Sequence, residues 1–296
     1  MENGRTGGSF RARRGFTRHR PARPGSRAGT VERMQDASIV PWPDRIRRVA
    51  FLFAMSAEGR GFAERLGLED RGSLDPDLPA HWLAGTHESP GGAPIEVAVG
   101  FAGTDPEHGI DRIGTTPATL AAYLLARRFD PDLLVNAGTC GGFEARGASV
   151  GTVYLGSKAL LFHDRRVPLP GFDAFGVGRI AAEPPSFLFE LLQAEPGIVS
   201  TGDSFTPCAE ELAFFETERV QAKDMEATAI ARLSRDLGVP FLAVKAVTDL
   251  VDDPEPEHDA FVRNLARVSS LLGDRLHALV EALSIAEGRP ASIGSE

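Results

Sequence analysis

The sequence predicts an α/β fold, a three-layer αβα sandwich around a twisted, mostly parallel central sheet. Two observations lead to this prediction. Short, continuous apolar runs recur along the chain, as expected of strands buried on both faces. Segments with helical periodicity separate these runs, so strands and helices alternate between about residues 48 and 283.

The first apolar run covers residues 49–55, and a helix is predicted directly after it at 57–66. Further strands are predicted at 81–86, 95–101, 133–137, 150–161, 198–201, 220–225 and 241–247. Further helices are predicted at 116–128, 186–193, 226–237 and 258–283. The segment 167–178 is rich in Pro and Gly, which predicts a long loop of functional or interface character.

The domain organisation follows from the composition. One folded domain is predicted at 46–285, preceded by a basic extension at 1–45 and followed by a frayed tail at 286–296. The first 33 residues contain nine arginines and only two acids, and we expect them to be disordered because they cannot bury a core. A targeting arm and a nucleic-acid-binding arm are the alternatives, and a start at Met34 would remove the arm.

Charge and cysteine content exclude several classes of function. The net charge is −9 despite the basic extension, so the remaining chain is strongly acidic, which argues against nucleic acid as the main partner. No run of 18 apolar residues occurs, so no membrane span is expected. Cys140 and Cys208 form neither a disulfide framework nor a metal-ligand spacing, and we therefore expect a reducing, cytoplasmic location.

Polar residues follow four of the predicted strands: Glu58, Thr139, Glu226 and Asp249. Ligands bind at the carboxyl ends of strands in open α/β folds. Three carboxylates at that edge could therefore perform acid–base chemistry and bind hydroxyl groups. Alternatively, Glu58 and Glu226 are ordinary acids at helix N-termini, and Asp249 is a solvated turn carboxylate.

No cofactor and no metal are expected. The glycines of residues 138–142 follow a strand but do not form a dinucleotide fingerprint. His163 has no partner at ligand spacing, and with Asp164 it is at least as well explained by a structural pair as by a catalytic one. Cys140 is interpreted as a buried structural thiol rather than a nucleophile.

A series of motifs occurs in order along the chain, at residues 54–58, 109–118, 135–143, 163–166, 201–205, 223–227 and 245–250. Each motif alone is weak, but the ordered series is specific. It resembles that of the 5′-methylthioadenosine/S-adenosylhomocysteine nucleosidases, plant-type branch, in the purine nucleoside phosphorylase superfamily. The resemblance covers about residues 48–283 and implies hydrolysis of an N-glycosidic bond, a small-molecule nucleoside as ligand, a homodimer, and a preference for 5′-methylthioadenosine.

The resemblance also implies roles for individual residues. Glu58 activates the attacking water, and Asp249 protonates N7 of the departing adenine. Glu226 accepts hydrogen bonds from the ribose hydroxyls. The implied substrate-binding residues are Thr139, Gly141, Phe205, Thr206, Lys223, Asp224, Met225, Glu226 and Thr248. Adenine leaves poorly until it is protonated, and the ribose becomes oxocarbenium-like, so one acid must keep its proton while another stays ionised.

Three alternatives stay open. A phosphorylase would need a fixed cation for phosphate; related phosphorylases have an arginine where this chain has Asn136, although Arg60 is close in sequence to Glu58. A non-catalytic nucleoside-binding protein should have lost one of the acids, and all three are present. A nucleosidase for another purine, such as a 6-oxo nucleoside, leaves no side-chain signature.

Overall fold

The computed structural model describes residues 40–285. The predicted frayed tail and all but the last six residues of the predicted basic extension lie outside this part. The strands are β1 (Arg48–Phe53), β2 (Glu69–Ser73), β3 (His81–His87), β4 (Ile95–Phe101), β5 (Leu133–Gly142), β6 (Val153–Phe162), β7 (Ile180–Ala182), β8 (Glu195–Thr201), β9 (Ala222–Asp224) and β10 (Phe241–Leu250). The helices are α1 (Ser56–Arg65), α2 (Thr115–Phe129), α3 (Phe172–Val177), α4 (Phe187–Leu192), α5 (Ala209–Glu218), α6 (Ala227–Leu237) and α7 (Glu257–Ile285), with a 3₁₀ turn at Glu144–Arg146.

All the strands belong to one mixed sheet of ten strands in the order β10-β6-β8-β9-β5-β1-β4-β3-β2, with β7 beside β6. Strand β10 also pairs with β5, so β5, β10, β6, β8 and β9 close into a ring. The strands β4, β1, β5 and β10 are parallel neighbours, whereas β2, β3 and β7 add antiparallel pairings. The parallel sheet that the sequence predicts is therefore found at the centre of the structure.

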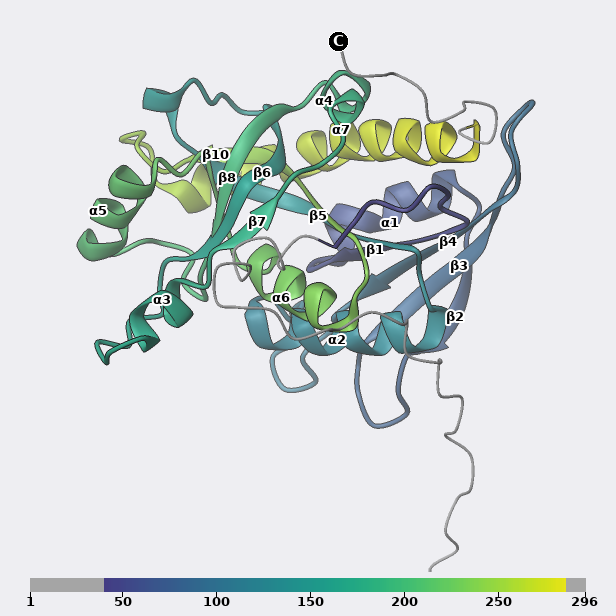
Figure 1. Ribbon diagram of the computed structural model, residues 1–296, viewed down its shortest axis with the longest axis horizontal. Coiled ribbons are helices and arrows are strands. Elements are labelled where there is room, and N and C mark those ends of the chain that lie inside the picture. The colour runs from purple at the N-terminus through teal and green to yellow at the C-terminus, as the bar shows by residue number, and fades with distance from the viewer. Residues whose placement is uncertain (1–39, 286–296) are drawn as a thin grey trace, which may run out of the picture. The chain divides into compact units, whose positions relative to one another are not determined.

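Helices cover both faces of the open part of the sheet. In Figure 1, α1 and α7 lie on one side and α2 and α6 on the other. Alternate residues of β1 enter two different cores: Val49, Phe51 and Phe53 pack with α1 and α7, while Ala50 and Leu52 pack with α2 and α6. This two-sided burial is the reason for the continuous apolar run and confirms the three-layer class.

The structure corrects several sequence-based boundaries. Strand β5 does not stop before the glycine cluster but continues to Gly142, because β10 and β9 pair with it there. Strand β10 also continues past residue 247 to Leu250 and Asp249 is buried, so the alternative that Asp249 is a solvated turn carboxylate was wrong. The predicted loop at 167–178 contains α3, and β2, β7 and α5 were not predicted.

No helix within residues 40–285 is both long and apolar enough to cross a membrane.

Candidate active site

A pocket opens at the carboxyl ends of β1, β5, β9 and β10, where the sequence predicted the polar residues to meet. The space between its walls, including the open mouth, is about 600 Å³. The residues that line it are Ala54, Met55, Glu58, Ile113, Thr139, Cys140, Gly141, Phe205, Lys223, Asp224, Met225, Glu226, Thr248, Asp249 and Phe261.

Glu58 lies in the first turn of α1 and is only 5% exposed. Its Oε1 accepts hydrogen bonds from both the backbone amide and the hydroxyl of Thr139, each at 2.7 Å. Its Oε2 accepts one from the amide of Met55 at 3.1 Å. A Cβ at Gly138 would approach the carboxylate oxygens to 3.2–3.3 Å, so the absent side chain leaves room for them. Three donors therefore fix the position and orientation of the carboxylate.

Glu226 and Asp224 share a buried cation. Lys245 Nζ lies 2.8 Å from Asp224 and 4.0 Å from Glu226. Burial raises the pKa of Glu226 to about 7, although Lys245 acts against the rise. Burial alone would lower the pKa of Lys245, but the two carboxylates raise it above its usual value, so the ammonium keeps its charge.

A backbone amide also holds the carboxylate of Glu226. The amide of Gly114, at the start of α2, donates to Oε1 of Glu226 at 3.0 Å. Asp224 is fixed by the hydroxyl of Thr201 at 2.5 Å and by the amide of Ala227 at 2.8 Å. Glu226 thus faces the pocket with one oxygen bound to an amide and the other near a cation, a geometry suited to receiving hydroxyl donors.

Asp249 is 3% exposed and is the second-last residue of β10. The hydroxyl of Thr248 donates to its Oδ1 at 2.7 Å. Burial raises the pKa of Asp249 to about 6, with Thr248 and Lys223 acting against the rise. A Cβ at Gly141 would come within 3.1 Å of Oδ2 of Asp249, so glycine at that position leaves space beside the carboxyl. Asp249 can thus hold a proton near neutral pH.

An aromatic pair forms another wall of the pocket. The rings of Phe205 and Phe261 pack edge to face with their centroids 5.5 Å apart. Lys223 Nζ donates to the carbonyl of Phe205 and lies 5.1 Å from the ring centroid. The same ammonium is 3.6 Å from Glu257 at the start of α7. Lys223 therefore connects the Phe205 loop to the helix that carries Phe261.

The structure brings ten of the eleven predicted site residues together around the pocket. The exception is Thr206, which is exposed and does not line the pocket. It follows Phe205 in the chain, and its side chain is in solvent. The alternative that Glu58 and Glu226 are ordinary acids at helix N-termini does not explain their burial, because both carboxylates lie in the wall of the pocket.

His163 and Asp164 lie behind the pocket rather than in its lining. The imidazole is buried against Phe215 and bonds Ser200 Oγ at 3.1 Å. Burial lowers the pKa of His163. Oδ2 of Asp164 accepts the amide of Asp203 at 2.8 Å, which fixes the loop before Phe205. His163 and Asp164 therefore contact other parts of the fold rather than the pocket.

Sequence reasoning did not identify Ile113 or Phe261 as pocket residues. Ile113 lies within the motif at residues 109–118, which resembles that of the plant-type branch. Phe261 lies in the second turn of α7, and nothing in its local pattern separates it from the core positions of that helix. Only the packing of α7 against the end of β10 brings it to the site.

The fold and the site together define an α/β enzyme whose pocket contains several buried carboxylates. Residues 96–281 match the family model described as the phosphorylase superfamily. The chain belongs to this superfamily and, within it, to the family of the 5′-methylthioadenosine nucleosidases.

Two plant proteins are close relatives. The chain is 38% identical to the 5′-methylthioadenosine nucleosidase of Arabidopsis thaliana, over 77% of this chain and 84% of the relative. It is 32% identical to the 5′-methylthioadenosine/S-adenosylhomocysteine nucleosidase of the same plant, over 81% and 92%. The apo structure of Arabidopsis thaliana 5′-methylthioadenosine nucleosidase superposes with a TM-score of 0.77 at 34% identity, covering 83% of this chain and 98% of that one.

Proposed function

We propose that this protein hydrolyses the N-glycosidic bond of 5′-methylthioadenosine, releasing adenine and 5-methylthioribose. The observation that carries the proposal is the convergence of Glu58, Glu226 and Asp249, all buried, on one pocket. Their surroundings differ, and so would their protonation states. Two similar carboxyl groups with separated roles are what glycosidic hydrolysis requires.

In the proposed mechanism, Asp249 holds the proton that the departing purine needs. Its pKa of about 6 keeps a useful fraction protonated near neutral pH. Protonation of N7 lets the C1′–N9 bond break with its electron pair going to adenine. The ribose then develops oxocarbenium character.

Glu58 activates water in this mechanism. Its carboxylate, held in place by three hydrogen-bond donors, takes a proton from the water that adds to C1′. The hydroxyl of Thr139, bonded to the same carboxylate, lies beside the path of that water. Glu226 accepts the hydroxyls of the ribose, and such bonds strengthen as positive charge grows on the ring.

The remaining roles are assigned by position. Phe205 and Phe261 offer a surface on which the purine can stack, and Met225 lies in the lining next to Glu226. Lys223 positions Phe205, whereas Asp224 and Lys245 fix the Glu226 carboxylate. Thr248 orients Asp249. The resemblance assigns the purine contact of Thr206 to its backbone, and the exposed side chain is compatible with that role.

Phosphorolysis is the competing reaction. Phosphate binding requires fixed cations, most often arginine. No arginine is present in the lining of this pocket within residues 40–285, and Arg60 is exposed. Asn136 donates to the carbonyl of Leu52 at 3.1 Å instead of facing a ligand. A dianionic phosphate would also lie next to Glu58, so water is the favoured nucleophile.

A chromatographic assay tests the reaction. Purified protein is incubated with 5′-methylthioadenosine, with and without phosphate, and the sugar product is identified. We expect free methylthioribose and adenine at the same rate in both. Methylthioribose 1-phosphate, formed only with phosphate, would establish phosphorolysis, and a 6-oxo nucleoside cleaved faster would assign another purine.

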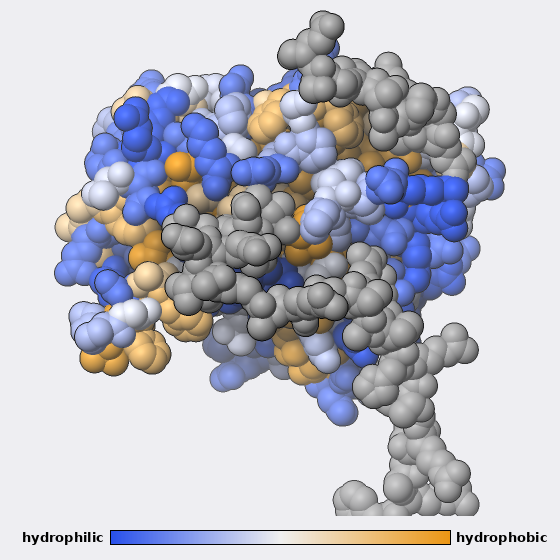
Figure 2. Space-filling model, in the orientation of Figure 1, coloured by the Kyte–Doolittle hydropathy of each residue, from blue (hydrophilic) through white to orange (hydrophobic). Residues whose placement is uncertain are grey.

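We also propose a homodimer in the cytoplasm. Leu169, Phe172 and Phe175 are 57%, 53% and 64% exposed on and beside α3. Figure 2 shows an apolar surface where α3 lies in Figure 1. Apolar patches of this kind support self-association. The two free cysteines, Cys140 and Cys208, support a reducing compartment.

A further inference from the structure

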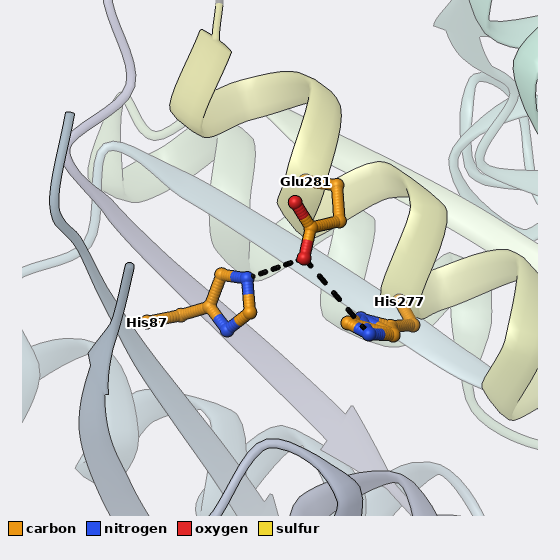
Figure 3. Close-up of side chains that lie close together, drawn as sticks. All are labelled: His87, His277 and Glu281. Atoms are coloured by element: carbon orange, nitrogen blue, oxygen red, sulfur yellow. Dashed lines mark hydrogen bonds and ion pairs between the residues drawn. The ribbon is translucent and has the colours of Figure 1, made fainter. Parts of the chain in front are cut away.

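A cluster of two histidines and a glutamate lies outside the active-site pocket. His87 is the last residue of β3, and His277 and Glu281 are one turn apart in α7. Figure 3 shows both imidazoles beside the Glu281 carboxylate. Nε2 of His87 lies 2.8 Å from Oε1 of Glu281, and Nε2 of His277 lies 3.9 Å from the same oxygen. One ligand-type atom from each residue lies within 4.8 Å of the other two.

We propose that His87, His277 and Glu281 bind one divalent transition-metal ion, with Zn²⁺ as the best match. Two imidazoles and one carboxylate favour zinc or a neighbouring first-row metal over Mg²⁺ or Ca²⁺, which prefer oxygen ligands. Sites with three such protein ligands leave one position for water. The side chains are 14–34% exposed, so an ion has access and the fourth position can be hydrated.

The geometry requires only small adjustments. Zinc bonds of about 2.0–2.2 Å in a tetrahedron place the donor atoms roughly 3.3–3.5 Å apart. The His87–Glu281 separation of 2.8 Å is shorter than this, and the His277–Glu281 separation of 3.9 Å is longer. A movement of His87 and Glu281 apart by about half an ångström and a similar approach of His277 would bring both distances to Glu281 to this spacing. The two imidazole ligand atoms lie within 4.8 Å of each other.

A simple hydrogen bond between strand and helix is the competing explanation. It accounts for His87 and Glu281 at 2.8 Å, whereas Nε2 of His277 lies 3.9 Å from the same oxygen, beyond hydrogen-bond distance. The rings of His87 and His277 also lie edge to face, 5.6 Å between centroids, although neither bonds the other. A shared ion explains why two imidazoles gather at one carboxylate.

A metal ion at this site would stabilise the fold and would take no part in the reaction. Phe261 lines the active-site pocket, and His277 follows it by 16 residues in the same helix, or about 24 Å along the axis. The amide of Ala93, beyond the turn after β3, already donates to Ser284 of α7 at 2.8 Å. A metal at His87, His277 and Glu281 would add a second, stronger connection between this hairpin and the end of α7.

Zn²⁺ titration tests the proposal directly. The full chain is stripped with a chelator and desalted, and Zn²⁺ binding is measured by competition with a chromophoric chelator. We expect one ion per chain, and Mg²⁺ should not compete. A hundredfold excess over the Kd should raise Tm by about 5–10 °C for a chain of this size. Failure of the wild-type chain to bind one equivalent overturns the proposal.

Variants identify the ligands. His277→Ala should weaken Zn²⁺ binding by more than about tenfold, since even the outer hydrogen-bond partners of metal ligands have effects of that size. His258→Ala removes an exposed histidine of the same helix and should bind Zn²⁺ like wild type. Because Nδ1 of His277 has no hydrogen-bond partner among the described residues and Nε2 lies 3.9 Å from Glu281, the variant should fold, and unchanged nucleosidase activity will verify this. Equal binding by His277→Ala and wild type would assign the ion to other residues.

Discussion

Thr139 donates two hydrogen bonds to a single oxygen of Glu58, one from its backbone amide and one from its hydroxyl, both at 2.7 Å. The two residues are 81 positions apart in the chain. One follows β1 at the start of a helix, and the other lies in the extended end of β5. Their contact fixes the orientation of the carboxylate that we propose as the base.

Replacement of Glu58 tests that role. In Glu58→Gln the amide oxygen can still accept the two Thr139 bonds, so the pocket should keep its shape while the base is lost. We expect kcat to fall by roughly 10²-fold or more, with little change in KM. Glu64→Gln, an exposed position of the same helix, is the matched control. A variant with near wild-type kcat would exclude Glu58 from the reaction.

Replacement of Asp249 tests proton donation. Asp249→Asn should abolish the cleavage of adenine nucleosides but spare an activated aryl riboside, whose leaving group needs no protonation. The ratio of kcat/KM for the two substrates is the measurement, and Asp259→Asn on the surface of α7 serves as control. Equal losses on both substrates would assign Asp249 a structural role only.

Asp249→Asn should have a higher free energy of unfolding than the wild type near neutral pH. Burial raises the pKa of Asp249 from its usual 3.8 to about 6, so its favourable contribution is complete below pH 3.8 and is lost as pH rises through 6. Asparagine is neutral throughout and can still accept the Thr248 hydroxyl. We expect a gain of about 1–3 kcal/mol in unfolding free energy at pH 7.5.

Urea denaturation at pH 7.5 and just below pH 4 measures this effect. The gain should be present at the higher pH and vanish at the lower one. A gain of equal size at both would show that the ionisation of Asp249 is not its cause.

The 5′ substituent of the nucleoside should determine substrate preference. Ile113 lines the pocket and is 43% exposed, so it offers apolar surface near the mouth. A methylthio group gains transfer energy there, whereas the charged end of S-adenosylhomocysteine must stay hydrated and the 5′-hydroxyl of adenosine is desolvated. We expect 5′-methylthioadenosine to exceed adenosine by about tenfold to a hundredfold in kcat/KM.

Ile113→Ser tests the origin of this preference. It should reduce kcat/KM for 5′-methylthioadenosine by about tenfold and leave that for adenosine nearly unchanged. If the wild type cleaves S-adenosylhomocysteine with the same kcat/KM as 5′-methylthioadenosine, the pocket is open at its far end. If the variant loses activity equally on all substrates, Ile113 does not select the 5′ group.

Self-association should depend on the apolar surface at α3. Light scattering should give the mass of a dimer at micromolar concentration. Phe172→Ser combined with Phe175→Ser should shift it toward monomer, because each removes exposed apolar area. Phe187→Ser, at an equally exposed position on α4, should leave the dimer intact. A wild-type monomer at that concentration would contradict the dimer.

The sequence predicted those features of the structure that depend on local pattern. The apolar run of β1 predicted a strand buried on both faces, and the ordered motifs predicted the site residues that meet at the pocket. Local pattern failed at Asp249, because the following acidic and proline-containing segment is typical of a loop. Its position in a strand depends on pairing with β5, more than 100 residues away in sequence.

What the sequence by itself determined is the class of fold, the family and the identity of the three acids. What only the tertiary structure decided is their environment: a pKa depends on burial and on neighbours such as Lys245, which are brought close by long-range packing. The same reason applies to Phe261 and to the His87–Glu281 contact, which spans 194 positions. Spacing along the chain carries no information on such contacts, since the ring of strands and the packing of α7 bring them together.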